Sequence, residues 1–293
     1  MICCQVCQNQ KLRNRCNMIE KKQITDTFFN FNSYSKLGND NSKYFALVTG
    51  GCGRIGSVFV SVLLNKGYNV IVLSRTKKNY KKYIKNLDVN LKKKIFWKKL
   101  DITNPLSIKT VASALSKKKI KILVNNAASS NRGKFFKYNA KNLNKELWGT
   151  FAGSMFLTEQ ILPKIRKIKN STIIYTGSLW GIHAPRFKIY KDLDIGPSPI
   201  IASGKAALLQ YAKFLAVREA DYGVRINSIL PGWFPRKGKV ERKDYIKRIK
   251  DNIPLNRVGK LNDLVSSVKF LISDESSYVT GHQLIVDGGY SLS

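Results

Sequence analysis

The chain has 293 residues, 43% of them hydrophobic, and a net charge of +34 from 52 Lys and Arg against 18 Asp and Glu. No apolar run approaches the roughly 18 residues that cross a membrane, and the N-terminus turns polar too early for a secretory signal. We therefore expect a cytoplasmic protein. The charge is compatible with an anionic partner or with a lysine-rich surface. Because no nucleic-acid recognition motif accompanies it, we expect no specific nucleic acid and no membrane as partner.

Residues 1–42 are polar and rich in Asn and Lys, and we expect them to form an extension before a single domain over 43–293. The aromatic residues between positions 28 and 34 are the part that we expect to pack on this domain. Four of the five cysteines lie in the extension, and Cys4 and Cys7 have half of the spacing of a zinc ribbon. The second pair of cysteines that a zinc ribbon needs is missing, so we expect reduced surface thiols and no metal site.

The next segment, Tyr44–Gly56, reads YFALVTGGCGRIG. Its residues Phe45–Thr49 predict a strand that is buried on both faces, and Ile55–Lys66 carries apolar side chains at helical spacing. A strand, a glycine turn and a helix in direct succession form a phosphate cradle, because the helix N-terminus offers free N–H groups to an anion. A plain tight turn is the alternative, but the strand–helix setting favours a dinucleotide. The residues expected to contact it here are Thr49, Gly50, Gly53, Arg54, Ile55 and Gly56.

Six further apolar runs of strand length follow, and helical patterns near residues 55–66, 76–91, 105–118, 140–168, 203–221 and 261–273 separate the runs. This alternation predicts an α/β fold with a doubly wound, Rossmann-like parallel sheet of about seven strands. Ligands of such sheets bind beyond the carboxyl ends of the strands, so the residues that end each run are the candidate binding residues. The six runs are Asn69–Leu73, Ile95–Leu100, Ile120–Val124, Ser171–Tyr175, Arg225–Leu230 and Gln283–Val286.

The end of the second run bears on the choice of cofactor. A carboxylate at this place would hold the ribose 2′-hydroxyl of NAD(H), but the chain has Ser74 and Arg75. A hydroxyl and a guanidinium favour the 2′-phosphate of NADP(H), and Arg54 is a second candidate cation. In so basic a chain, both arginines can equally be solvated surface residues.

The third and fourth runs end in further candidates for the cofactor site. Asp101 is expected to accept a hydrogen bond from the adenine amino group, with Ile102 next to it in the same turn. The fourth run leads into the sequence NNAA, where Asn125 and Ala127 are expected to lie beside the cofactor. An amide side chain here can also tie neighbouring strands together.

These motifs resemble the short-chain dehydrogenase/reductase family over about residues 43–293. The stretches that carry the resemblance are TGGCGRIG, the turn at Asp101, NNAA, the turn at Ser178, the pair Pro231 and Gly232, and VTGHQLIVDGGYS. The resemblance implies a hydride transfer between a nicotinamide cofactor and a carbonyl or alcohol. It also places Pro231 and Gly232 at the cofactor.

Members of the family act through an Asn, a Ser, a Tyr and a Lys. Ser178 matches the serine that orients the substrate oxygen, although a turn-capping role is the alternative, and Lys205 matches the lysine that holds the nicotinamide ribose. The tyrosine position holds Ile201 and the asparagine position holds Thr150. Isoleucine has no proton to donate, and the loss of a general acid costs roughly 10²–10⁴-fold in rate. His183 is either a surrogate acid or a solvated loop residue.

Three hypotheses about function follow. The first is an NADP(H)-dependent oxidoreductase with atypical acid/base chemistry, and the second is a catalytically silent dinucleotide-binding sensor or scaffold. The third is an anion- or nucleic-acid-associated protein, which only the charge supports. The family resemblance also implies a homodimer or homotetramer, formed through the strongly apolar helices near 150–166 and 203–221.

The substrate is expected to be a small carbonyl compound or alcohol. The loop from Gly181 to Pro199 resembles the branch of the family associated with surface-polysaccharide sugar biosynthesis, which implies a sugar-derived substrate. This loop and the segment Trp233–Asp251 should shape the substrate pocket, and their basic residues hint at an anionic group on the substrate.

Overall fold

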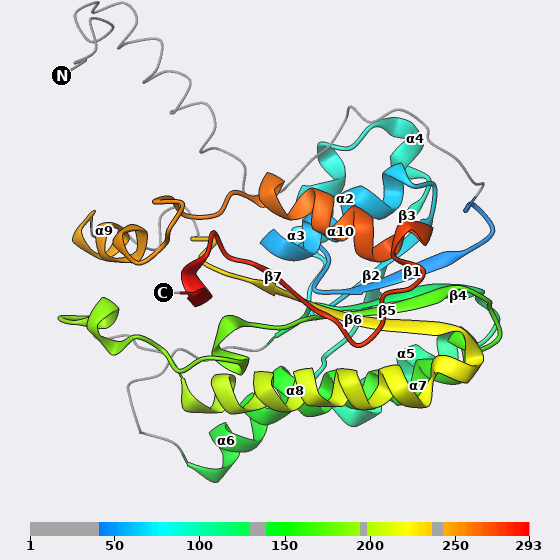
Figure 1. Cartoon of the computed structure of the whole chain (residues 1–293). Coiled ribbons are helices and arrows are strands. Elements are labelled where there is room, and N and C mark those ends of the chain that lie inside the picture. The colour runs from blue at the N-terminus through cyan, green and yellow to red at the C-terminus, as the bar shows by residue number, and fades with distance from the viewer. Residues whose placement is uncertain (1–40, 129–138, 194–197, 236–242, 293) are drawn as a thin grey trace, which may run out of the picture.

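The computed structural model describes residues 41–128, 139–193, 198–235 and 243–292, so the predictions for residues 1–40 lie outside the described residues. At the centre is one sheet of seven parallel strands (Figure 1). Each apolar run of the sequence is therefore a strand in the structure, and each strand begins and ends within one residue of the predicted bounds. The strands are β1 (Phe45–Thr49), β2 (Asn69–Ser74), β3 (Ile95–Lys99), β4 (Ile120–Asn125), β5 (Ser171–Thr176), β6 (Val224–Pro231) and β7 (Gln283–Val286).

The strand order is β3-β2-β1-β4-β5-β6-β7, so β1 lies between β2 and β4. The chain runs outward from β1 to β3 on one side, then crosses over to β4 and runs outward again to β7. This reversal between β1 and β4 defines the doubly wound fold, and the predicted fold class is confirmed. At the carboxyl ends, Thr49 of β1 is paired with Leu73 of β2, and Val48 is paired with Val124 of β4.

Helices cover both faces of the sheet, as Figure 1 shows. The helices α2 (Arg54–Asn65) and α10 (Val265–Ile272) pack on one face, and their buried apolar side chains form one core with those of the strands. The helices α5 (Pro105–Ala114), α7 (Gly153–Ile165) and α8 (Pro199–Arg218) form the second core on the opposite face. Strands that are buried on both faces explain why the apolar runs in the sequence are continuous rather than alternating.

Two predicted helices are interrupted in the structure. The pattern near 76–91 divides into α3 (Lys78–Lys85) and α4 (Val89–Lys92), since Asp88 caps the second helix by accepting a bond from Asn90 N. The pattern near 140–168 divides into α6 (Ala140–Leu147), a π-helical turn η2 (Trp148–Ala152) and α7. π-Helical turns occur often at functional sites, and this one contains Thr150.

The helix α8 begins four residues before the predicted start, at Pro199, because Ser198 caps it by accepting a bond from Ile201 N. Among the described residues, α8 is long and apolar enough to cross a membrane by length and composition. Its buried side chains, among them Leu208 and Leu215, belong to the second core of the domain. Burial within the domain thus accounts for part of its apolar composition.

Candidate functional site

A cavity of about 990 Å³ lies at the carboxyl ends of the strands. It lies where the strand order reverses between β1 and β4, the place at which parallel sheets of this type bind ligands. Ser178 and most of the residues predicted to bind a cofactor line this cavity. Those cofactor residues are Gly50, Gly53, Arg54, Ile55, Gly56, Ser74, Arg75, Asp101, Ile102, Ala127, Pro231 and Gly232.

The glycine turn has the geometry of an anion cradle. Gly50 has φ of +63°, which is a conformation that favours glycine, and its carbonyl oxygen accepts a bond of 2.8 Å from Gly53 N. A Cβ atom on Gly56 would overlap that same carbonyl oxygen, so only glycine allows α2 to start so close to the turn. The first turn of α2 carries no acidic residue, and no side chain caps it. Its N–H groups are therefore available to an anion in the cavity.

Thr49 and Asn126 hold the ends of β1 and β4 together. Thr49 is fully buried, and its Oγ1 accepts bonds of 2.9 Å from the backbone N of Asn126 and of Ala127. The Nδ2 of Asn126 donates to Thr49 O at 2.9 Å, which is the tie between strands expected from an amide at this place. Thr49 thus supports the cavity from behind and does not line it.

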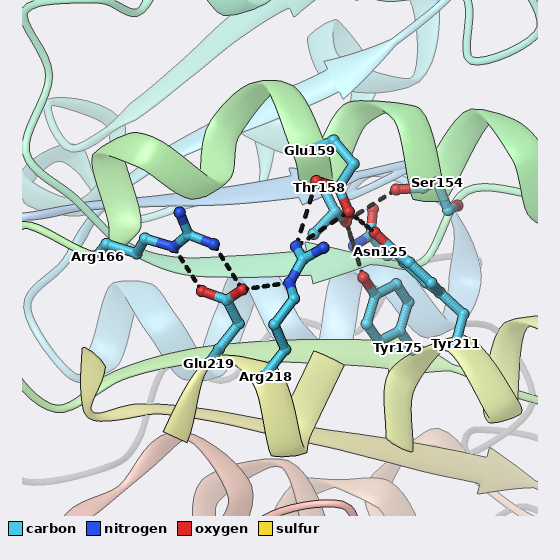
Figure 2. Close-up of polar contacts among 9 residues, drawn as sticks. All are labelled: Asn125, Ser154, Thr158, Glu159, Arg166, Tyr175, Tyr211, Arg218 and Glu219. Carbon is cyan, nitrogen blue, oxygen red and sulfur yellow. Dashed lines mark hydrogen bonds and ion pairs between the residues drawn. The ribbon is translucent and has the colours of Figure 1, made fainter. Parts of the chain in front are cut away.

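Asn125 lies on the other side of the strand end. Its Nδ2 donates to Thr158 Oγ1 at 2.9 Å in the buried layer between β4 and α7 (Figure 2). Asn126, and not Asn125, is the asparagine that lines the cavity. Consecutive residues of a strand point to opposite faces of the sheet, and the sequence prediction chose the wrong one of the two side chains.

The end of β2 places a cation at the rim of the cavity. The hydroxyl of Ser74 is engaged within the chain, since it donates to Thr76 O at 3.0 Å and accepts from Trp97 Nε1 at 2.9 Å. Arg75 is exposed, lines the cavity and makes no hydrogen bond with the described residues. Of these two residues, Arg75 is therefore the group that can receive a phosphate.

Asp101 lies near Arg75 on the same wall of the cavity. Partial burial opposes ionisation of this carboxyl, but Thr103 donates to it from its backbone N at 3.0 Å and from its Oγ1 at 2.8 Å. These bonds, with the positive charges of Arg75 and Lys145, hold the pKa of Asp101 below its ordinary value. The residue is thus an ionised hydrogen-bond acceptor beside the cavity.

Arg54, the second predicted cation, reaches across the cavity wall. Its Nη1 donates to Phe234 O at 3.0 Å and also to Pro235 O. The guanidinium thus ties the start of α2 to the segment after β6. We conclude that Arg54 shapes the cavity, and that Arg75 is the better placed of the two for a 2′-phosphate.

Ser178 lies at the carboxyl end of β5, where it caps the short helix η3 (Leu179–Gly181). Its Oγ accepts a bond of 3.3 Å from Trp180 N, so the turn-capping role is real. The hydroxyl proton has no acceptor among the described residues. The same side chain can therefore cap the turn and donate to a ligand oxygen in the cavity.

Lys205 lies on α8 and is almost completely buried. Its Nζ donates to Thr176 O at 2.5 Å, directly beneath the turn that carries Ser178. Burial lowers the pKa of Lys205 to about 8. It is not among the residues that line the cavity, which places it behind the cavity wall.

The positions that hold the family tyrosine and asparagine are occupied here by Ile201 and Thr150. Ile201 occupies the first turn of α8, and its side chain has no group to donate. Thr150 is buried on η2 with its Cγ2 facing Gly204, and its Oγ1 has no hydrogen-bond partner among the described residues. His183 is exposed and does not line the cavity, so nothing in the geometry supports it as a surrogate acid.

The sequence prediction named the segment after β6 as part of the pocket but did not identify the aromatic rings that line it. Trp180, Trp233, Phe234, Tyr245 and Tyr290 all line the cavity. Trp180 follows Ser178 by two positions and Trp233 directly follows Gly232. Their closeness to these predicted site residues was the sequence signal that could have placed them in the cavity. Phe234 follows Trp233, whereas Tyr245 comes from α9 (Lys243–Asp251) and Tyr290 from the C-terminal turn η8 (Tyr290–Leu292), so only the folded chain brings the rings together.

Two arginines of the substrate segments, Arg186 and Arg248, have partners within the chain. Arg186 donates to Asn252 Oδ1 at 3.0 Å and to Tyr290 O at 3.1 Å, and Arg248 donates to Ile189 O at 3.1 Å. These bonds fasten the loop after η3 to α9. No described residue between 182 and 193 lines the cavity, so this part of the loop supports the pocket from outside.

Among the described residues, no group of three or more His, Cys, Asp or Glu side chains could hold a metal ion. Cys52, the one cysteine in this part of the chain, is buried in the glycine turn, and burial raises its pKa to about 12. It is therefore an inert thiol. The four N-terminal cysteines lie outside the described residues.

Several known proteins are similar to this chain over most of its length. Residues 53–291 match the model of a family described as enoyl-(acyl carrier protein) reductase. A 3-oxoacyl-[acyl-carrier-protein] reductase of Thermotoga maritima is 28% identical over 247 residues, which is 83% of this chain and 96% of that protein. A chloroplastic tropinone reductase homologue of Arabidopsis thaliana is 25% identical over 291 residues, which is 95% of this chain and 87% of that protein.

Solved structures give the same result. A short chain dehydrogenase from Leptospira borgpetersenii with bound NAD+ is 29% identical and superimposes with a TM-score of 0.75, covering 90% of this chain and all (100%) of the other. A complex of Pseudomonas aeruginosa RhlG with NADP shares the fold at a TM-score of 0.74 and 24% identity, covering 85% and 96% of the two chains. The matches cover most of the chain, and its sheet of seven parallel strands has the same architecture as these dehydrogenases. The chain therefore belongs to the short-chain dehydrogenase/reductase family.

Proposed function

We propose that the protein is an NADP(H)-dependent oxidoreductase that transfers a hydride between the nicotinamide and a carbonyl or alcohol of a small, sugar-derived substrate. One observation carries this proposal. A single cavity connects the N–H groups at the start of α2 and the free guanidinium of Arg75 with the hydroxyl of Ser178. An anion cradle, a phosphate-binding cation and a donor to a substrate oxygen thus face one continuous space.

The residues of the cavity fit a phosphorylated dinucleotide. The pyrophosphate would lie on the α2 N-terminus, where the glycines leave room for it. Asp101 would accept a bond from the adenine amino group, and Arg75 would bind the 2′-phosphate. Asn126, Pro231 and the strand ends beside them form the remaining wall toward Ser178. When bound, the cofactor supplies or accepts the hydride.

The chain contributes positioning at the reacting end of the cavity. Ser178 has a free hydroxyl proton and would orient the substrate oxygen. Lys205 donates to Thr176 O from behind the cavity wall, so it holds the end of β5 that leads to Ser178. With Ile201 in place of a tyrosine, the proton for the substrate oxygen would come from another hydroxyl that lines the cavity, such as that of Ser178, or from solvent. We therefore expect slow turnover rather than none.

The alternative is a catalytically silent dinucleotide-binding scaffold or sensor. Ile201 is the observation that favours it, because the family residue with the greatest chemical role is absent while the cofactor cradle is intact. The two functions differ in whether the wild-type protein oxidises NADPH in the presence of a carbonyl compound.

The test is NADPH oxidation by the wild type and by Ser178→Ala across a panel of carbonyl compounds that includes keto-sugars. We expect a low rate in the wild type and a fall of at least about tenfold in the variant, because a donor to the substrate oxygen is lost. A wild-type rate equal to that of NADPH and substrate without protein would contradict the proposal. Equal rates in wild type and variant would remove Ser178 from the mechanism.

The proposal includes self-association as a homodimer or homotetramer. Support comes from the outer faces of α7 and α8, which expose Met155, Phe214 and Val217. Exposed apolar side chains that gather on adjacent helices mark an interaction surface more often than isolated ones do. The part of the proposal that concerns a sugar-derived substrate rests on the long loop after η3.

A further inference from the structure

The Ser178 end of the cavity is built from aromatic rings that brace one another. We call Trp180, Trp233, Phe234, Tyr245 and Tyr290 the aromatic wall, since all five line the cavity. Trp233 lies 6.1 Å from Tyr245 and 6.3 Å from Tyr290 between ring centroids, with interplanar angles of 83° and 74°. These are edge-to-face contacts, which aromatic rings favour.

Tyr190 supports the aromatic wall from behind. Its ring centroid lies 6.4 Å from that of Trp180, 6.1 Å from that of Trp233 and 6.0 Å from that of Tyr245. The backbone is fixed as well, since Gly259 N donates to Trp233 O at 2.8 Å and the Arg54 guanidinium donates to Phe234 O. Trp180 and Trp233 are therefore held in place before any ligand arrives, and both residues are partly exposed at the cavity.

The aromatic wall is uncharged. The charged side chains that line the cavity in the described part of the chain are Arg54, Arg75 and Asp101. Arg75 and Asp101 follow β2 and β3, on the side of β1 away from Ser178, and Arg54 donates to backbone carbonyls. Of the arginines in the substrate segments, Arg186 and Arg248 lie in the described part of the chain, and both are bonded to other groups. An anionic group placed against the aromatic wall would lose hydration without gaining a described cation.

We infer that the substrate is an uncharged cyclic carbonyl compound or alcohol whose ring stacks on Trp180 and Trp233 while its oxygen meets Ser178. This inference rests on the proposed function, because that function places the reacting oxygen at Ser178. Stacking needs a flat, apolar ring face, which both a carbocyclic ketone and the C–H face of a pyranose provide. Among the described residues, the aromatic wall offers no cation to the anionic group that the basic segments of the sequence suggested.

The test is isothermal titration of the full chain saturated with NADP+, so that a ketone can bind but cannot be reduced. The probes are β-tetralone as a carbocyclic ketone, a methyl ketoglucopyranoside as a neutral pyranose, and acetoacetyl-coenzyme A as an anionic linear thioester. We expect one of the two ring probes to bind more tightly than the thioester. Which ring probe binds better identifies the source of the ring.

Two variants locate the binding. Trp233→Leu and Trp180→Leu each remove a ring but keep an apolar side chain. Each should weaken the binding of the tighter ring probe about three- to tenfold. The matched control is Phe96→Leu, which changes a 43% exposed aromatic residue on the edge strand β3, outside the cavity. It should leave the affinity unchanged. A melting temperature for each variant checks that it folds.

The inference is overturned if acetoacetyl-coenzyme A binds more tightly than both ring probes. It is also overturned if both folded Trp variants bind the ring probe as tightly as the wild type. If the protein binds NADP+ but binds none of the three probes, this inference is overturned and the proposed cofactor function still stands. Failure of NADP+ itself to bind contradicts the proposed function, and this inference falls with it.

Discussion

In the proposed function, Arg75 is the residue that decides between the two nicotinamide cofactors. It is exposed at the cavity rim, without a hydrogen bond to the described residues, and its charge acts on Asp101 nearby. The other side chains that could have competed for this role are engaged. The hydroxyl of Ser74 bonds to Thr76 O and Trp97, and Arg54 is bonded to the segment after β6.

Replacing this one cation should therefore change cofactor preference. We expect Arg75→Ala to weaken the binding of NADPH about 10- to 100-fold, the range for losing a hydrogen bond to a charged group. The affinity for NADH should be nearly unchanged. The measurement is the dissociation constant of each cofactor. Lys78→Ala, a neighbouring lysine on α3 that does not line the cavity, is the matched control. Equal weakening of both cofactors would contradict a role at the 2′-phosphate.

The sequence predicted which residues lie at the cavity better than it predicted the contacts that each side chain makes. Thr49 and Asn125 were expected at the cofactor, yet the first ties two strand ends and the second faces α7. Motif matching locates a turn, because glycine and strand patterns are local. The direction of each side chain depends on which face of the sheet the residue occupies, and that register is set by the whole sheet.

The helices α7 and α8 are joined by a polar network (Figure 2). Glu219 is fully buried and accepts bonds of 2.6 and 2.7 Å from Arg166 and of 2.7 Å from Arg218. Burial opposes its ionisation, but the bonds from these arginines outweigh burial and hold the pKa of Glu219 below its ordinary value. The stability that this network supplies is full above the unfolded-state pKa and is lost as the pH falls through the folded-state value. Glu159 extends the network by accepting from Tyr211 at 2.6 Å.

The same helix pair exposes three apolar side chains. Phe214 is 60% exposed and Val217 is 82% exposed on α8, and Met155 is 38% exposed on α7. The polar network joins the two helices that carry these side chains. A symmetric pair of chains would bury this surface against its own copy.

Charge on that surface should separate the subunits. We expect the wild type to elute at two or four times its chain mass of 33.2 kDa by light scattering. The double variant Phe214→Glu and Val217→Glu should elute at the single-chain mass, since like charges would face each other across the interface. The control is Val89→Glu, which alters a 62% exposed residue on α4 and should not change the mass. A wild type that elutes as a monomer would contradict the proposal.

At the scale of the whole molecule, alternation of apolar runs and helical patterns was sufficient to predict the fold. Each strand is short, continuous and apolar because helices cover both of its faces, and this signal is local. The aromatic wall could not be predicted, because its rings come from turns after β5 and β6, from α9 and from the C-terminus. Only the closing of the sheet and the docking of α9 bring these distant segments together.

The central claim is that this chain moves a hydride although Ile201 stands where the family has a tyrosine. The most direct measurement is the rate of NADPH oxidation by the wild type beside that of Ile201→Tyr, with the same carbonyl panel and saturating cofactor. We predict a wild-type rate above that of NADPH without protein, and a rise of about 10²–10⁴-fold when the general acid is restored. A wild type that does not oxidise NADPH, beside a variant that does, would contradict the claim and identify the natural protein as a silent dinucleotide-binding member of its family.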